Sequence, residues 1–411
     1  MNLIVAGLLF GDEGKGHTVA KLTELMGASA IVRFSGGCQA AHRVVQPNGD
    51  SHVFAQIGAG SVVSPTVKTF LTPKMAWNPV NLLAEIHVHE SHGIAPLHKR
   101  LYVSSECPTT TFYHRALNRA TEIHRQHVDG SRLSSVGLGV GDTFDDVRKS
   151  PELVLYAKDF LSVPLLREKL ECLRKAKGEQ AQKLCPEAQD RYKQELGILF
   201  DNVDKYVQLL MVARAAFIPN IKYDFEDLLH KEVKAGTAIF EGSQGTMLDC
   251  EVGTTPYITH SRTTPSEAFS YLYGFDKMVL GVTRTYAHRH GLGPLPTESN
   301  DLMYKDALNE FNEWQRDFRL GYLDIPMLRY SMETNHCFDG IILTHMDQIP
   351  DKFCPRYEET DIDFRQLALE PKVTPVFENL ESPPEILEAS LGLPVLAQSW
   401  GEIDTWTDIK L

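Results

Sequence analysis

The sequence lacks paired cysteines, an excess of basic charge and a long hydrophobic run. Its seven cysteines are scattered and form no C-x-x-C pair, which argues against a disulfide framework or a zinc ribbon and favours a reducing compartment. The formal net charge of −13 would repel nucleic acid. The most apolar stretch, residues 209–221, is short and contains Arg214, so a membrane span is not indicated. We therefore expect a soluble, cytoplasmic protein with neither a nucleic-acid nor a membrane partner.

The composition of the chain indicates a globular protein. The 411 residues are 43% hydrophobic and 23% charged, and they show neither an internal repeat nor a low-complexity segment. This length and composition suit one elaborate α/β domain, although two or three smaller ones would also fit. We expect a single large domain spanning residues 1–411.

The N-terminal residues predict a strand, a turn and a helix. Residues 3–9 form a short apolar run, residues 11–16 are glycine-rich, and apolar residues then follow at helical spacing from Val19. A second apolar run, residues 30–34, leads into a turn of small residues at 35–42. This order predicts a βαβ unit and an α/β fold with a central, mostly parallel sheet, whose loops gather at one sheet edge.

The rest of the chain alternates between helical and strand-like patterns. Residues from about 151 to 232 have a helical texture, so we interpret them as a helical insertion within the domain. Residues 238–242, 278–282 and 340–344 read as buried strands, and each is followed by polar residues suited to a site.

The glycine-rich turn at residues 11–16 could hold a phosphate. Glycines after a strand let backbone N–H groups approach phosphate oxygens, and Lys15 can balance the charge. The spacing departs from the common G-x-x-x-x-G-K-[ST] pattern, so a plain turn with a solvated lysine is the alternative. Asp12 and Glu13 weaken that alternative, because acids beside a phosphate are useful when they bind a metal or move a proton.

Three further positions could carry chemistry. His42 follows the second small-residue turn and could act as a general acid or stabilise an oxyanion, although a structural histidine is the alternative. Gln244 lies in a glycine-flanked turn after a strand, and Asp347 follows another strand. A carboxylate so placed can accept two hydrogen bonds from a guanine edge.

Together these pieces resemble the adenylosuccinate synthetase family, in order and over most of the chain. The resemblance rests on residues 11–16 (GDEGKG), 240–249 (FEGSQGTMLD), 256–259 (PYIT), 291–298 (GLGPLPTE), 321–324 (GYLD) and 343–347 (LTHMD). It implies a P-loop-like architecture related to GTPases. It also implies a GTP-dependent ligase that phosphorylates O6 of a 6-oxopurine nucleotide, IMP first of all, and joins it to L-aspartate. The products are then adenylosuccinate, GDP and phosphate.

The resemblance also assigns residues. The catalytic positions are Asp12, His42, Lys15 and Gln244. The GTP-binding positions are Gly11, Glu13, Gly14, Lys15, Gly16, His345, Asp347, Ser399 and Gly401. The nucleotide-substrate positions are Asp12, Gln39, Ser135, Val136, Gln244, Thr259 and Arg148, and the amino-acid positions are Arg319 and Arg316. Asp12 and the backbone carbonyl of Ala41 are the implied Mg²⁺ ligands, and a homodimer is implied, with Arg148 as the residue lent to the partner subunit.

Departures from the family pattern leave alternatives open. In the loop at residues 312–320, Arg319 falls on a family arginine, but Asp317 stands where an arginine faces the aspartate carboxylate. Arg262 and Pro265 resemble a phage branch that makes 2-aminoadenylosuccinate from dGMP, whereas Asp12 stands where that branch usually has serine. Phage-type synthesis or another amine donor is therefore the alternative reaction. A nucleotide-binding protein without catalysis and an unrelated P-loop hydrolase are the other two readings.

The charge of the predicted site differs from that of the whole chain. Cationic side chains fall in the loops assigned to the site, so we expect a locally positive pocket in an acidic protein. These side chains are Lys15, Arg43, Arg262, Arg289 and Arg319.

Overall fold

A ten-stranded sheet forms the centre of the fold. The computed structural model describes residues 1–411 except 131–132, 134, 305–312, 370–372 and 402–404. The sheet has the strand order β17-β16-β13-β9-β1-β8-β2-β5-β6-β7, and all neighbours are parallel except β16 and β17. The predicted α/β class with a mostly parallel central sheet is therefore confirmed.

The strands of this sheet are β1 (Asn2–Gly7), β2 (Ala30–Arg33), β5 (Lys68–Leu71), β6 (Leu101–Ser104), β7 (Ile221–Lys222), β8 (Ala238–Gly245), β9 (Lys277–Arg284), β13 (Gly340–Thr344), β16 (Val395–Trp400) and β17 (Thr405–Trp406). Smaller sheets are formed by β3 (His42–Val45) with β4 (Ser51–Phe54), by β10 (Ala287–His290) with β11 (Phe318–Gly321), and by β12 (Leu323–Asp324), β14 (Lys352–Tyr357) and β15 (Pro375–Asn379). The strands expected at 3–9, 30–34, 238–242, 278–282 and 340–344 are all present.

The α-helices of the described residues are α1 (Lys15–Met26), α2 (Pro79–Ser91), α3 (Phe112–Asp129), α4 (Val140–Lys149), α5 (Val163–Ala181), α6 (Pro186–Asp201), α7 (Val203–Phe217), α8 (Phe225–Ala235), α9 (Ser266–Phe269), α10 (Ile325–Asn335) and α11 (Pro383–Leu391). Among the ranges that the structure describes, no helix is long and apolar enough to cross a bilayer.

Strand β1 shows why the sheet is buried on both faces. Every one of its residues is buried, as expected for a central parallel strand. Successive side chains point to opposite faces: Leu3 and Val5 join one hydrophobic core, whereas Ile4 and Ala6 join the other. The continuous apolar run therefore serves two cores at once.

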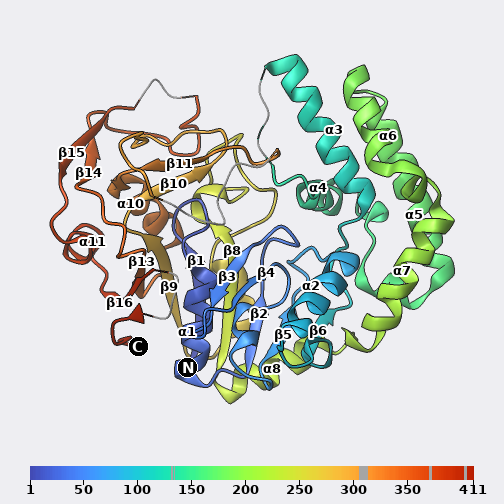
Figure 1. Ribbon diagram of the computed structural model, residues 1–411, viewed down its shortest axis with the longest axis horizontal. Coiled ribbons are helices and arrows are strands. Elements are labelled where there is room, and N and C mark those ends of the chain that lie inside the picture. The colour runs from blue at the N-terminus through green and yellow to red at the C-terminus, as the bar shows by residue number, and fades with distance from the viewer. Residues whose placement is uncertain (131–132, 134, 305–312, 370–372, 402–404) are drawn as a thin grey trace.

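The helical region lies at one side of the sheet. In Figure 1, α3, α5, α6 and α7 stand together at the upper right, beyond the end of the sheet that carries β5 and β6. Helices α5 to α7 fall within the range expected to be a helical insertion, about 151–232. Helix α3 precedes that range yet packs extensively against α6, whereas β7 and α8 within the range return to the sheet. The helical group and the expected insertion therefore overlap without coinciding.

The parallel sheet brings distant loops to one edge. The segments that follow β1, β2, β8, β9, β13 and β16 all leave the sheet at its carboxyl end, because neighbouring parallel strands run in the same direction. Ligands of open α/β sheets bind at this edge. The predicted residues Asp12, Gln244 and Asp347 lie at or just after the ends of β1, β8 and β13, and His42 follows β2.

Outside this edge, Asp324 is a buried carboxyl group that should make stability depend on pH. It accepts hydrogen bonds from the hydroxyl of Tyr357 at 2.7 Å and from the backbone N–H of Met327 at 3.1 Å. Burial raises the pKa of Asp324 to about 7. Because the pKa is raised on folding, the stability from this group is fully present below its unfolded pKa of 3.8 and is lost as pH rises through about 7.

We expect the substitution Asp324→Asn to remove this part of the pH dependence. Asparagine keeps an acceptor oxygen for both donors but carries no proton to lose. Urea unfolding at pH 5 and pH 8 measures the effect. The loss of unfolding free energy between the two pH values should be smaller in the variant, by a few kcal/mol at about 1.4 kcal/mol per unit of pKa. Equal losses in both proteins would show that Asp324 is not the group responsible.

Candidate active site

A cavity of about 650 Å³ opens at the carboxyl edge of the sheet. It brings together most residues that the sequence singled out, although these are distant along the chain. The predicted site residues that line it are Gly11, Asp12, Glu13, Gly14, Lys15, Gly16, Gln39, Ala41, His42, Ser135, Val136, Gln244, Thr259, His345, Asp347, Ser399 and Gly401. One cavity therefore holds residues assigned to catalysis, GTP binding and nucleotide binding.

The buried side chain of Glu13 stabilises the glycine-rich loop. This buried carboxylate accepts a hydrogen bond from the backbone N–H of Leu9 at 2.5 Å and lies 3.4 Å from Lys15 Nζ. Burial raises the pKa of Glu13 to about 7, although Lys15 opposes the shift. A Cβ at Gly7 would lie 1.9 Å from the Glu13 carboxylate, so glycine is needed there. The loop then enters α1 through Gly14, whose φ is 87°.

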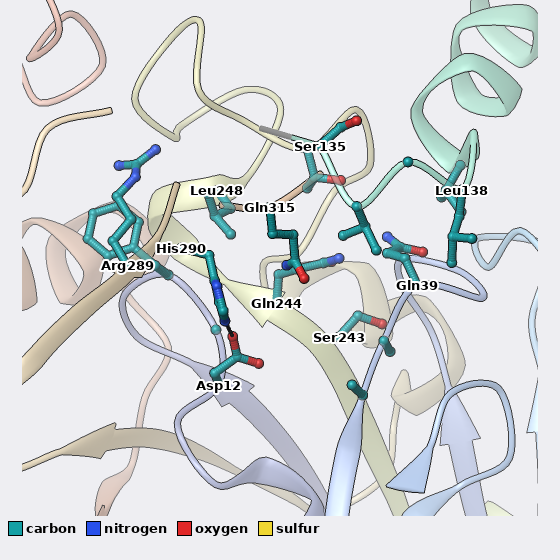
Figure 2. A pocket seen from close by; sticks show the side chains of 18 of the residues that line it. Asp12, Gln39, Ser135, Leu138, Ser243, Gln244, Leu248, Arg289, His290 and Gln315 are labelled. Carbon is teal, nitrogen blue, oxygen red and sulfur yellow. Dashed lines mark ion pairs between the residues drawn. The ribbon is translucent and has the colours of Figure 1, made fainter. Parts of the chain in front are cut away.

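Asp12 presents its carboxylate to the cavity from a left-handed backbone. Its φ is 51°, a conformation that aspartate tolerates better than most residues. The Arg284 guanidinium holds the Asp12 carbonyl oxygen, with Nε at 2.6 Å. The Asp12 carboxylate lies 3.5 Å from His290 Nε2 (Figure 2). Side chains from β9 and β10 thus support both the backbone and the side chain of Asp12.

His42 is held by a buried acidic partner. Its Nδ1 is bonded to the Glu241 carboxylate, and its Nε2 lies 3.2 Å from the carbonyl oxygen of Ser243. Burial lowers the pKa of His42, and the Glu241 hydrogen bond opposes that shift. Burial alone would raise the pKa of Glu241, but the Arg33 guanidinium at 3.8 Å and His42 together hold it below its ordinary value. An ionised Glu241 therefore fixes the ring and keeps Nδ1 protonated.

Two glutamines offer unused hydrogen-bonding capacity to the cavity. The amide oxygens of Gln39 and Gln244 are buried and have no hydrogen-bond partner among the described residues. Both side chains line the cavity and are drawn with Ser243 and Asp12 in Figure 2. A buried amide oxygen without a partner is costly, so these oxygens are suited to a ligand that donates hydrogen bonds.

The far end of the cavity is built by the C-terminal strands. Asp347 Oδ1 accepts a hydrogen bond from the backbone N–H of Gly401 at 2.7 Å, and the backbone N–H of Met346 donates to the Ser399 carbonyl oxygen at 3.0 Å. His345 has a φ of 59°. These bonds join the segment after β13 to the end of β16 and to the residue that follows it.

Three predicted ligands do not line the cavity in the described part of the chain. Arg319 is bonded to the Glu298 carboxylate and donates to the carbonyl oxygens of Gly291 and Gly293, each at 2.8 Å. Arg148 donates to the carbonyl oxygen of His260 and pairs with Asp145, each at 2.5 Å. The third predicted ligand that does not line the cavity is Arg316, whose backbone is in the left-handed region with a φ of 67°. In the loop expected at 312–320, Asn312 lies outside the described residues.

The cations that line the cavity differ from the expected set, because Arg125 and Arg284 line it in addition to predicted residues. Lys15, Arg43 and Arg289 line it, as predicted. Arg262, by contrast, pairs with Asp249 and Glu251 away from the lining residues, and Arg319 is neutralised by Glu298. These two arginines were expected to add positive charge to the cavity because they lie in loops assigned to the site, but both form ion pairs with neighbouring carboxylates.

Comparison with known proteins agrees with this arrangement. The family model described as adenylosuccinate synthetase matches residues 4–385. The chain belongs to the adenylosuccinate synthetase family. A family member from Hahella chejuensis, itself named adenylosuccinate synthetase, is 31% identical over 373 residues, which cover 88% of this chain and 81% of the relative.

Solved structures of family members share the fold. The fully ligated adenylosuccinate synthetase of Plasmodium falciparum superposes with a TM-score of 0.79 at 21% identity, covering 98% of this chain and 97% of that chain. The succinoaminodeoxyadenylate synthetase of cyanophage S-2L, bound to dGMP and to dATP as an energy donor, gives a TM-score of 0.61 at 16% identity, covering 98% and 93%. Both likenesses concern the fold.

The sequence did not identify several residues that hold the site residues in place. Arg284 and His290 contact Asp12, His288 contacts Gly11, and Glu241 anchors His42. Glu241 lay within a recognised motif but had no assigned role. The pattern from 287 to 291 (AHRHG) could have shown that the two histidines share a strand face, because residues two apart on a strand do so, but it does not show that this face meets the loop.

Proposed function

We propose that this chain is a GTP-dependent ligase that phosphorylates O6 of IMP and joins the purine to L-aspartate, giving adenylosuccinate, GDP and phosphate. Its membership of the adenylosuccinate synthetase family supports this activity. The observation that carries the proposal is that Asp12 and Lys15 of the glycine-rich loop line one cavity with His42, which follows a different strand. Buried partners hold both Lys15 and His42 in place.

The reaction has a clear chemical logic. An oxo group leaves poorly, so amination at C6 needs O6 to be converted into a better leaving group. Removal of the N1 proton places charge on O6, which attacks the γ-phosphorus of GTP and releases GDP. The amine of aspartate then attacks C6, the C6–O6 bond breaks, and phosphate departs carrying O6. The N1 proton and two protons of the aspartate ammonium group are lost; the departing phosphate takes up one of them, and two are released to water.

Each site residue has a separate role in this reaction. Asp12 takes the proton from N1, and His42, protonated on both ring nitrogens with Nδ1 held by Glu241, donates a hydrogen bond from Nε2 to O6 as its charge grows. Lys15 and the loop from Gly11 to Gly16 bind the phosphates of GTP. The guanine base is bound by Asp347, whose remaining acceptor capacity suits the two donors of a guanine edge, together with His345, Ser399 and Gly401.

The second nucleotide lies against the opposite wall of the cavity. We assign its contacts to Gln39, Ser135, Val136, Gln244 and Thr259, all of which line the cavity. Arg148 is 45% exposed in its side chain, and we propose that it is lent to the partner subunit of a homodimer.

The seven cysteines are free, which agrees with a cytoplasmic location.

The residues present suit magnesium. The Asp12 carboxylate and the Ala41 carbonyl are hard oxygen ligands that line the cavity beside the phosphate loop, and Mg²⁺ prefers one or two protein oxygens together with substrate phosphates. We therefore propose that Asp12 and Ala41 hold Mg²⁺. When bound, the ion would neutralise charge on the transferred phosphoryl group.

Phage-type synthesis from dGMP is the second candidate. Its support is the fold shared with the cyanophage enzyme and the positions of Arg262 and Pro265. The carboxylate of Asp12 favours IMP, because in the phage branch a smaller residue leaves room for the 2-amino group. Another amine donor is the remaining variant, since Arg319 is engaged by Glu298.

A substrate panel distinguishes these candidates. Purified protein is supplied with GTP and Mg²⁺ and with IMP, dIMP, GMP or dGMP, each with and without aspartate, and the products are identified by mass spectrometry. The proposal predicts a succinylated purine and GDP only when IMP and aspartate are both present. Product from dGMP would favour the phage-type reaction. GTP hydrolysis that ignores the purine monophosphate, or binding without turnover, would contradict the proposed function.

A further inference from the structure

The segment formed by β9 and β10 contacts the two residues that begin the catalytic loop. Arg284 ends β9 and donates to the Asp12 carbonyl oxygen. His288 and His290 lie on the same face of β10, since they are two residues apart. His288 Nε2 is 2.5 Å from the Gly11 carbonyl oxygen, and His290 Nε2 is 3.5 Å from Asp12 Oδ2 (Figure 2). The β9–β10 segment thus contacts the backbone of both residues and the side chain of Asp12.

The catalytic loop needs these contacts because two of its residues have a left-handed backbone conformation. Gly11 and Asp12 both have positive φ values, 90° and 51°, and a non-glycine residue in this region persists when its surroundings stabilise it. The Asp12 carboxylate also faces the open side of the cavity, with 35% of the side chain exposed. An exposed carboxylate without an anchor samples several rotamers, and a misplaced base loses much of its catalytic effect.

His290 is itself well fixed. Its side chain is only 12% exposed. The strand pairing places it opposite Phe318 of β11, and the two rings lie 4.9 Å apart between centroids. A side chain held by a neighbouring strand and an aromatic ring is a firmer anchor than one on a loop.

We propose that His290 is a positioning residue for Asp12: through its Nε2 atom it holds the carboxylate in the orientation needed to take the proton from purine N1. The inference rests on the proposed function, because it assigns His290 to the base of that reaction. His290 acts on the substrate through Asp12, so its removal should slow turnover while the phosphate loop still binds GTP.

A matched set of substitutions tests the role of this one atom. Glutamine places an amide at about the position of histidine Nε2, whereas asparagine places it at about the position of Nδ1. His290→Gln should therefore keep kcat within a few-fold of wild type. His290→Asn and His290→Leu should lower kcat about 10- to 100-fold, the usual cost of losing a group that orients a catalytic ligand. The affinity for GTP, measured by calorimetry, and the Tm should change little in all three.

The outcomes separate this inference from the proposed function. Wild-type protein that forms no succinylated product would overturn both. Active wild-type protein with an equally active His290→Asn variant would overturn the inference alone. Equal losses in the glutamine and asparagine variants would also overturn it, because the effect would not depend on Nε2. Recovery of full kcat at high Mg²⁺ would assign His290 to metal binding and contradict the positioning of a base.

Discussion

Replacing Asp12 by asparagine should lower kcat by about 10³-fold, the middle of the range for loss of a general base. Asparagine has nearly the same shape and can still face the cavity, but it cannot take a proton from N1. The contact of Arg284 with the residue 12 carbonyl oxygen is a backbone contact, so the loop should keep its conformation. The Tm should therefore stay close to wild type while product formation is lost.

A matched control is Asp227→Asn. Asp227 is an exposed residue in the first turn of α8, away from the cavity, and its substitution should leave kcat unchanged. Steady-state assays of both variants with IMP, aspartate and GTP supply the comparison. If Asp12→Asn turned over at a rate close to the control, Asp12 would not be the base, and the assignment of the site would fail.

Glu241→Gln should have the second largest effect, lowering kcat by about 10²- to 10³-fold. The glutamine amide no longer carries the charge that fixes the His42 ring and supports a proton on it. Arg33 also loses its anionic neighbour, because Glu241 is the buried carboxylate 3.8 Å from its guanidinium. A buried charge left without its partner costs about 3–5 kcal/mol. The free energy of unfolding should therefore fall together with activity.

Glu85→Gln is the control for this substitution. Glu85 is also a largely buried glutamate, and its carboxylate accepts hydrogen bonds from backbone N–H groups at residues 55–57, but it does not line the cavity. Burial raises the pKa of Glu85 to about 7, so an uncharged side chain is tolerated there. Its substitution should leave kcat close to wild type. Equal activity in the Glu241 and Glu85 variants would show that the contact with His42 is structural only.

Much of the fold was predictable because its signals are local. A parallel strand such as β1 is a continuous apolar run, and a glycine turn between it and α1 is visible directly in the sequence. Strands of one direction then bring their following loops to one edge. Asp12, His42, Gln244 and Asp347 could therefore be placed in one cavity before any coordinates were considered.

What the sequence did not reveal depends on pairing between distant segments. The register of β10 with β11 places Arg289 opposite Arg319, and the Glu298 carboxylate then engages Arg319. No local pattern reports that an arginine has found a carboxylate partner. For the same reason, the contacts of the β9–β10 segment with the catalytic loop appear only when both segments are folded.

The most direct test of the central claim follows the oxygen atom of the purine. The protein is incubated with GTP, aspartate and IMP that carries a heavy-oxygen label at O6, and the released phosphate is analysed by mass spectrometry. Because O6 is phosphorylated before the amine attacks, we predict that each phosphate formed with adenylosuccinate carries the label. Unlabelled phosphate, with the label left in the purine or released to water, would contradict the account.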